Sequence, residues 1–361
     1  MRVLLLHAYS AANAGDGLLV DESIELVRQA LGPSVQFTVC ASHPETFGDL
    51  DARVVSSALT TQGYSWEYLQ TLRRVNEFDL IVGVGGGYLR AGGLTEGFKS
   101  ALIHGPQLFA ASRAATPSIY LPQSIGPAKA GISKVLHRQL KNLDRVFVRD
   151  DRSMQEFGGA GALRTSDLAI LGAAIKHRKG GPNAVPIVSA RPVRGVVPPL
   201  VTNMCEQLGT FDGYVQSQTS GNDDRAVMDQ IGARQIVSRA ELLDSDTAEA
   251  RVVIAVRLHA ALMALRAGHL VIHLAYERKG FGAFSDLGLS EYVHNVSMFE
   301  PNRVVEQVRG LLHDAEVREE YRTQVGRAME TAKVRRSELV RELQLVAMET
   351  GPRGGGSENQ S

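Results

Sequence analysis

"RVVIAVRLHAALMALRAGHLVIHLAY" (Arg251–Tyr276) holds two apolar runs on either side of a short helical pattern. Both runs are rich in Val, Ile and Leu, which is typical of parallel strands buried on both faces. The segment between them, "AALMALRAG", predicts a short helix. A strand, a helix and a second strand in this order form the repeating unit of a doubly wound α/β sheet.

The same alternation extends over most of the chain. A helix is predicted by "GDGLLVDESIELVRQALG", because Val20, Ile24, Val27 and Leu31 share one helical face and Gly32 follows as a stop. Further strands are predicted from the runs "RVLLLHA", "VQFTVCA", "DLIVGVG", "SIYLPQS", "RVFVRD", "VPIVSAR", "GYVQSQ" and "RQIVS".

The domain organisation follows from where this alternation lapses. Charge, Gly and Pro replace the periodicity over residues 176–186, which predicts a hinge. We therefore expect an α/β protein with two Rossmann-like domains facing a cleft, over residues 1–178 and 185–300. Residues 301–349 predict a C-terminal helical segment that packs on the domains, and residues 350–361 a disordered tail.

Composition limits the kinds of partner. Lys+Arg and Asp+Glu both number 39, so the net charge is zero, which argues against a nucleic-acid binder. An anionic ligand would have to be met by locally placed cations. Cys40 and Cys205 are expected to be reduced thiols, and the N-terminus is expected to be a strand and not a secretory signal. We expect a cytoplasmic protein, with peripheral association at the inner face of the membrane left open.

Arg257 and His259 follow the first apolar run, where ligands bind in open α/β sheets. We expect both side chains to leave the strand on the same side, next to the start of a helix. Together they would receive a small, multiply charged anion. The alternative is a structural ion pair for Arg257 and a boundary histidine at position 259. Arg191 ends another predicted strand and offers a planar fork for carboxylate or phosphate.

Three segments of the first domain that follow predicted strands contain small or polar residues. In "NAGDG", Asn13 and Asp16 flank glycine, and Asp16 could cap the helix or face a ligand. Gly86 lies in "VGVGGGYL", which lacks the spacing of a dinucleotide site. Gln123 follows a strand in "LPQSIGP" and could bind a sugar hydroxyl or its own loop.

Other chemistries have little support in the sequence. "DDRSMQEF" predicts a structural capping box between Ser153 and Glu156. The histidines are scattered, so no metal site is expected. A nucleophile elbow of the G-x-S-x-G type is absent from the sequence as well.

Taken in order along the chain, these segments resemble the polysaccharide pyruvyl transferase family over about residues 1–295. The matching pieces are "NAGDG", "GVGGGYL", "LPQSIGP", "VRDDRS", "SDLAI", "VSARP", "VRLHAALMAL" and "LAYERKGFGAFSDLGL". The resemblance implies a fold like that of GT-B glycosyltransferases. It also implies transfer of the pyruvyl group of phosphoenolpyruvate onto two hydroxyls of a cell-surface glycan, which forms a ketal and releases phosphate.

Roles for individual residues follow from that resemblance. Arg257, Arg191 and Lys279 would bind phosphoenolpyruvate, and His259 would act as general acid or base because its ordinary pKa lies near neutrality. Asp16 would be a second acid/base or an acceptor ligand. The residues expected on the acceptor side are Asn13, Gly86 and Gln123. No cofactor or metal is expected, and the linkage of the acceptor, to lipid or otherwise, and the oligomeric state stay open.

Two other functions remain possible at this point. A nucleotide-sugar glycosyltransferase of the same architecture would need a carboxylate for the ribose, and Glu277 in "AYERKG" could serve. A non-catalytic relative that binds a glycan would keep the fold without turnover.

Overall fold

The computed structural model describes residues 1–91, 94–128, 130–172, 175, 178, 181–219, 222–244 and 249–348. Contacts divide the chain into two compact units. The first consists of Met1–Ser10, Val20–Thr165 and the described residues from Ser337 onward, and the second of Ala11–Leu19 and Ser166–Arg336. The predicted tail and residues 176, 177, 179 and 180 of the predicted hinge lie outside the described residues.

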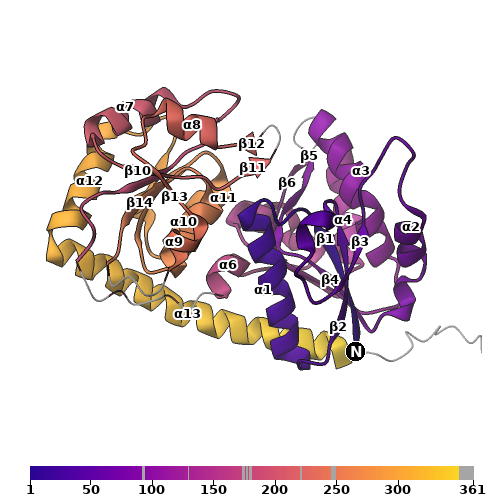
Figure 1. The fold of residues 1–361 in the computed structure, drawn as a ribbon. Helices are drawn as coiled ribbons and strands as arrows, with labels where there is room; N and C mark the ends of the chain where they lie inside the picture. Colours follow the sequence, from indigo (N-terminus) through magenta and orange to yellow (C-terminus); the bar gives the residue numbers. More distant parts are fainter. Residues whose placement is uncertain are drawn as a thin grey trace, which may run out of the picture. The chain divides into compact units, whose positions relative to one another are not determined.

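The first unit contains an eight-stranded sheet in the order β3-β2-β1-β4-β6-β7-β8, with β5 paired to β6 (Figure 1). Every strand pair in it is parallel. The strands are β1 (Arg2–Ala8), β2 (Gln36–Ala41), β3 (Arg53–Ser56), β4 (Leu80–Gly83), β5 (Gly86–Ala91), β6 (Ser118–Ala128), β7 (Arg145–Val148) and β8 (Ala162–Arg164). The helices are α1 (Ala14–Leu31), α2 (Trp66–Arg73), α3 (Leu94–Ala111), α4 (Ala130–Lys141) and α5 (Asp151–Phe157).

The apolar runs form these strands because helices on both faces of the sheet remove them from water. Six successive residues of β1 are buried, and Leu4 and Leu6 contribute to a core with Ile81 and Tyr120. Each fully buried Leu or Ile side chain stabilises the fold by about 1.5–3 kcal/mol. Gly32 ends α1 in a left-handed conformation, with φ of 96°, as predicted for a glycine stop.

The second unit contains a six-stranded sheet in the order β13-β10-β9-β14-β15-β16, again parallel, and a small antiparallel pair, β11-β12. The strands are β9 (Ile187–Ser189), β10 (Asp212–Tyr214), β11 (Gln218–Thr219), β12 (Asn222–Asp223), β13 (Ile236–Val237), β14 (Val252–Ala255), β15 (Leu270–Ala275) and β16 (Val293–Asn295). The helices are α6 (Leu168–Leu171), α7 (Pro199–Leu208), α8 (Arg225–Gln230), α9 (Arg239–Leu243), α10 (Leu258–Arg266) and α11 (Arg278–Asp286).

Two helices close the described chain, α12 (Pro301–His313) and α13 (Ala315–Met348). α13 is anchored in the second unit by Tyr321, whose hydroxyl donates to the carbonyl of Val271 and accepts from its N–H. In the first unit, Gln344 of α13 donates to the carbonyl of Ala30 at 3.1 Å. The predicted α/β class, with two doubly wound parallel sheets and a C-terminal helical segment, is confirmed.

One prediction about a helix start is wrong. Ser153 is not the N-cap of α5, because the Asp150 carboxylate accepts from the Ser153 N–H at 2.9 Å and takes that place. Glu156 pairs instead with Arg152, one turn earlier in the same helix. Asp150 stands one residue before α5 in extended backbone, which is the position that a capping carboxylate needs.

Candidate functional site

Three cations of the second unit follow three neighbouring strands. In the register of the sheet, Ala255 of β14 pairs with Ser189 of β9 on one side and with His273 of β15 on the other. Arg191, Arg257 and Lys279 each come two to four residues after the end of their strand. Because parallel strands end at the same edge, the cations start from one edge of the sheet, where open α/β sheets bind ligands.

Arg257 stands between β14 and α10 and is almost completely buried. It is the N-cap residue of α10, with extended backbone at φ −86° and ψ 126°. Its guanidinium holds the carboxylate of Asp224 through two bonds of 2.7 Å, from Nε to Oδ2 and from Nη2 to Oδ1. Asp224 is completely buried, and the Ser217 N–H also donates to it, at 3.2 Å. The ion pair left open by the sequence is therefore present.

His259 lies in the first turn of α10 and not on the strand, which ends at Ala255. The expectation that strand alternation directs Arg257 and His259 to one side is therefore wrong. The His259 ring packs directly against Gly15 of α1: a Cβ added at Gly15 would stand 2.2 Å from His259 Nδ1. A glycine is needed here because any side chain would overlap the ring.

The loop before α1 belongs to the second unit and lies beside the same strand ends. Asn13 forms an isolated bridge with Ser217, the residue that also bonds Asp224. The Asn13 side-chain oxygen accepts from the Gly15 N–H at 3.2 Å, and its amide donates to Asp16 at 2.9 Å. Asn13 thus caps α1, while Asp16 lies in the first turn of the helix. Asn13 and Asp16 therefore stand on either side of Gly15, the residue that packs on His259.

Arg191 and Lys279 are partly exposed and each has a neighbour that orients it. Arg191 donates to the Tyr276 hydroxyl at 3.2 Å, and its guanidinium carbon lies 5.3 Å from the centre of the Tyr276 ring. Lys279, in the first turn of α11, pairs with Glu277 at 3.0 Å. Tyr276 limits the positions of the Arg191 fork, whereas Lys279 is bound to a carboxylate that an anionic ligand would have to replace.

Buried titratable groups around this edge have shifted pKa values. Burial lowers the pKa of His273 to about 4, and the charge of Lys279 adds to that effect. His273 is neutral at pH 7 and bonds through Nδ1 to the carbonyl of Ala255 at 2.7 Å. Burial raises the pKa of Asp224, while the bonds from Arg257 and the charge of Arg191 oppose that rise. Asp224 thus lies within electrostatic reach of both arginines.

Gly86 and Gln123 belong to the first unit, where they are partners in the register of β5 and β6. The expectation that Gln123 follows a strand in a turn is wrong, because β6 continues to Ala128. Gln123 is completely buried, and within the described residues neither its side-chain oxygen nor its nitrogen has a hydrogen-bond partner. Its carboxamide is near the Tyr88 hydroxyl, which donates to the Val84 carbonyl instead.

Sequence reasoning missed a second buried polar group, at the end of β1. His7 has φ of 71°, in the left-handed region, and its N–H donates to Gln107 at 2.7 Å. Its ring bonds His104 at 3.3 Å and the Tyr120 hydroxyl at 2.9 Å. Burial lowers the pKa of both histidines, that of His104 to about 4. A histidine inside the apolar run "RVLLLHA" is the only local signal of this cluster.

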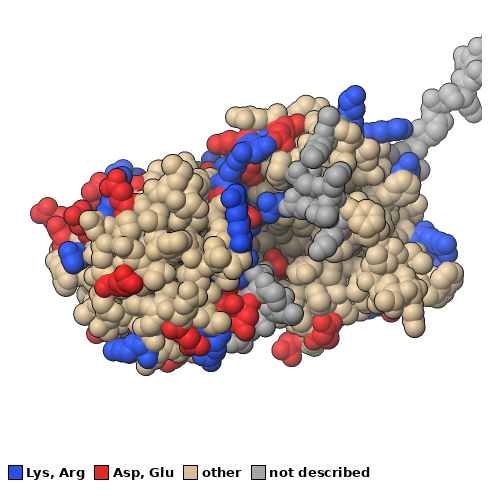
Figure 2. Space-filling model, turned by 90° about the horizontal axis from the view of Figure 1, so that it is seen from above, with Lys and Arg blue, Asp and Glu red and all other residues tan. Residues whose placement is uncertain are grey.

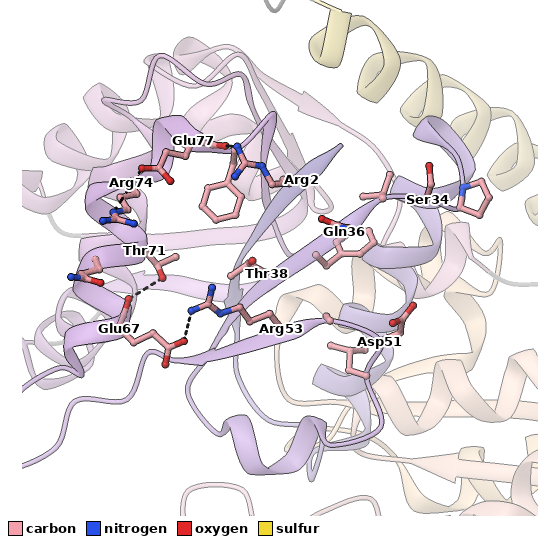
Figure 3. A pocket seen from close by; sticks show the side chains of 17 residues that line it. Arg2, Ser34, Gln36, Thr38, Asp51, Arg53, Glu67, Thr71, Arg74 and Glu77 are labelled. Atoms are coloured by element: carbon pink, nitrogen blue, oxygen red, sulfur yellow. Dashed lines mark hydrogen bonds and ion pairs between the residues drawn. The ribbon is translucent and has the colours of Figure 1, made fainter.

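The first unit contains a pocket of about 790 Å³. It opens at the amino ends of β1, β2 and β3, near Arg2 and Arg53 (Figure 3). Arg53 pairs with Glu67 at 2.8 Å, and Arg74 lies 3.8 Å from Glu77. Because these charges neutralise one another and lie at the edge opposite to the ligand-binding one, this pocket is not the candidate site.

On the face that Figure 2 shows, no single sign of charge dominates the described residues, and basic and acidic side chains are interspersed. Among the described residues, no group of three or more His, Cys, Asp or Glu side chains could hold a metal ion. None of the described helices has the length and apolar character needed to cross a membrane.

Comparison with known proteins now bears on this arrangement. The sequence model of the polysaccharide pyruvyl transferase family matches residues 13–278, from Asn13 through the start of α11. The chain belongs to this family. The matched range includes the site residues of the second unit: Asn13, Asp16, Arg191, Asp224, Arg257 and His259. Lys279 is the first residue after the matched range. None of the curated proteins matches the sequence.

Solved structures support the fold alone, because sequence identity is low. A protein described as a UDP-N-acetylglucosamine 2-epimerase of Listeria monocytogenes has a TM-score of 0.58 at 9% identity, over 98% of both chains. HepE of Anabaena, in complex with UDP and glucose, has a TM-score of 0.55 at 12% identity, over 97% of this chain and 99% of that chain. The calicheamicin glycosyltransferase CalG4 has a TM-score of 0.51 at 16% identity, over 98% and 100%. The predicted GT-B-like fold is thereby confirmed.

Proposed function

We propose that this protein transfers the pyruvyl group of phosphoenolpyruvate to two hydroxyls of a sugar, which forms a cyclic ketal and releases phosphate. The observation that carries the proposal is the placement of Arg191, Arg257 and Lys279 after three adjacent parallel strands. Phosphoenolpyruvate bears a phosphate and a carboxylate close together, so a single cation cannot neutralise it. Each charge-assisted hydrogen bond to it would contribute about 1.5–3 kcal/mol.

The arginines suit the two anionic groups because their planar forks bind two oxygens at once. Arg257 is fixed by Asp224, and Arg191 by Tyr276, so little conformational freedom would be lost on binding. Lys279 lies at the start of α11, where the helix dipole also favours an anion.

The reaction removes two protons from the sugar hydroxyls and delivers two, one to the methylene carbon of the donor and one to the departing phosphate. A proton adds to the methylene carbon of the donor, and the first sugar hydroxyl loses its proton as its oxygen bonds C2. The bond between C2 and the phosphate oxygen then breaks, phosphate leaves, and the second hydroxyl adds to C2 with loss of its proton. His259 is the proposed general acid and base, since an imidazole both gives and accepts protons near pH 7.

The acceptor would be a glycan of the cell surface or its precursor. Asp16 is proposed as a second acid/base or as a ligand of the acceptor hydroxyls, since it is bonded to Asn13 and directly follows Gly15, which packs on His259. The remaining acceptor-side proposals are Gly86 and Gln123, whose buried carboxamide retains unused hydrogen-bonding capacity.

The test is phosphate release from phosphoenolpyruvate with a panel of lipid-linked, nucleotide-linked and polymeric glycans, followed by mass spectrometry of the glycan. We expect phosphate and a pyruvate ketal in equal amounts, and loss of both in the His259→Ala variant. Transfer of a sugar from a nucleotide sugar, with no response to phosphoenolpyruvate, would instead establish a glycosyltransferase. Binding of glycan without any turnover would establish a non-catalytic relative.

A further inference from the structure

Asp224 departs from the usual role of an aspartate in front of a helix. It is the N-cap residue of α8, yet its side chain makes no cap hydrogen bond. The neighbouring Asp223 accepts instead from the Arg225 N–H, at 2.9 Å. The Asp224 carboxylate is thereby directed to the guanidinium of Arg257, 33 residues further along the chain.

Hydrogen bonds within its own segment of the chain also fix the Asp224 carboxylate. The Asp224 N–H donates to the carbonyl of Ser217 at 3.0 Å, and the Ser217 N–H donates back to the carboxylate. The bridge between Asn13 and Ser217 ties the same segment to the loop before α1. A completely buried carboxylate with these bonds has one position, and its two bonds to Arg257 fix the plane of the fork.

We propose that Asp224 is a positioning residue that presets the Arg257 fork for the anionic donor. The inference rests on the proposed function, because it assigns Arg257 to phosphoenolpyruvate. Asp224 itself touches no substrate. It acts by holding the guanidinium of Arg257 in one plane, in the orientation in which Arg257 binds the donor.

Asp212 provides an internal comparison. It too is completely buried and bound to arginines, to Arg251 at 2.7 Å and to Arg234 at 3.0 Å. It is the first residue of β10, however, so it lies at the amino edge of the sheet, opposite to the candidate site. If the ion pair between Asp224 and Arg257 were purely structural, its loss should affect the Tm and the Kd of phosphoenolpyruvate in the same way as the loss of the Asp212 pair.

The two interpretations predict opposite signs for donor binding. If Asp224 were only a nearby negative charge, its removal would strengthen the binding of an anion. If it positions Arg257, its removal weakens binding despite that electrostatic gain. The Asp224→Asn change keeps the size of the side chain and removes the charge, so the sign of the change in affinity distinguishes the two.

The experiment measures the Kd of phosphoenolpyruvate by calorimetry for the full chain and for Asp224→Asn, Asp212→Asn and Arg257→Lys, with the Tm of each. We expect a Kd tenfold or more above that of the parent for Asp224→Asn, and an unchanged Kd with a lowered Tm for Asp212→Asn. Arg257→Lys keeps the charge but cannot form the two bonds, so it should raise the Kd as much. This variant tests the inference even where Asp224→Asn fails to fold.

Each outcome is decisive. A parent protein that binds phosphoenolpyruvate while Asp224→Asn binds it equally or more tightly overturns the positioning role alone. An unchanged Kd in Arg257→Lys overturns it in the same way. A parent protein that does not bind phosphoenolpyruvate, but binds a nucleotide sugar, overturns the proposed function and this inference with it.

Discussion

Replacement of Gly15 by alanine should damage the protein, although such a change normally favours a helix. Gly15 lies within α1, where alanine would be better than glycine by about 1 kcal/mol if nothing else changed. The added methyl group, however, would lie 2.2 Å from Nδ1, 2.5 Å from Cγ and 2.6 Å from Cβ of His259. The overlap with Cβ means that rotation of the ring cannot relieve the clash.

The size of the effect follows from that geometry. His259 or α1 has to move by about 1 Å before the contact becomes ordinary, and overpacking of this kind costs about 1–3 kcal/mol. We therefore expect Gly15→Ala to be less stable than the parent and not more stable. Because a displacement of about 1 Å in a catalytic group can lower the rate by about 100-fold, turnover should fall by at least about tenfold.

Thermal unfolding and phosphate release measure the two effects. The matched control is Gly326→Ala in α13, since an added Cβ there meets nothing within 4 Å. It should raise stability by about 0.5–1 kcal/mol and leave turnover unchanged. If Gly15→Ala also gained stability and kept its activity, the contact between α1 and His259 would be refuted, along with the role of that contact.

Three further predictions concern buried histidines, an ion pair and a close helix contact. Folding should weaken as the pH falls from about 6.5 to 4, by up to about 1.4 kcal/mol per pH unit for each histidine that stays neutral only in the folded state. Urea unfolding at several pH values tests this, and a flat profile would contradict it. The histidines with a pKa lowered to about 4 by burial are His104, His269 and His273. Glu277→Gln should lower the Kd of phosphoenolpyruvate by about two- to fivefold, because it releases Lys279 from a partly exposed pair; calorimetry that shows weaker binding would argue against donor contact by Lys279. Gly280→Ala should lower the Tm by several degrees, since its Cβ would stand 2.3 Å from His273 Nε2; an unchanged Tm would show that α11 does not pack on that ring.

The strands are the part of the fold that the sequence predicts best. Runs such as "RVLLLHA" and "LVIHLAY" are buried on both faces, so most of their residues are apolar. Such a strand can be recognised in the sequence without knowing which strands it pairs with. The short strands β3, β8 and β16 were not predicted, because each contains an exposed residue and lacks a continuous buried run, and their pairing depends on neighbours distant in sequence. The strands β5, β11 and β12 were not predicted either.

The details of the candidate site were less predictable, for two physical reasons. Helix starts depend on backbone conformation, so α10 begins at Leu258 and places His259 by helical geometry instead of strand alternation. The partner of Arg257 is 33 residues away and is brought near only by the folded loop around Ser217. The sequence analysis did not single out Asp224, whose side chain leaves the capping bond to Asp223 and turns to Arg257.

The central claim is that the cations at this edge bind phosphoenolpyruvate. Calorimetric titration of the full chain with phosphoenolpyruvate and with UDP-glucose tests it most directly, alongside Arg191→Gln and Arg194→Gln. Arg194 is an exposed neighbour in the following turn, so its variant removes the same charge away from the strand end. The account predicts saturable binding of phosphoenolpyruvate that Arg191→Gln abolishes and Arg194→Gln retains. Binding of UDP-glucose with no response to phosphoenolpyruvate would contradict it.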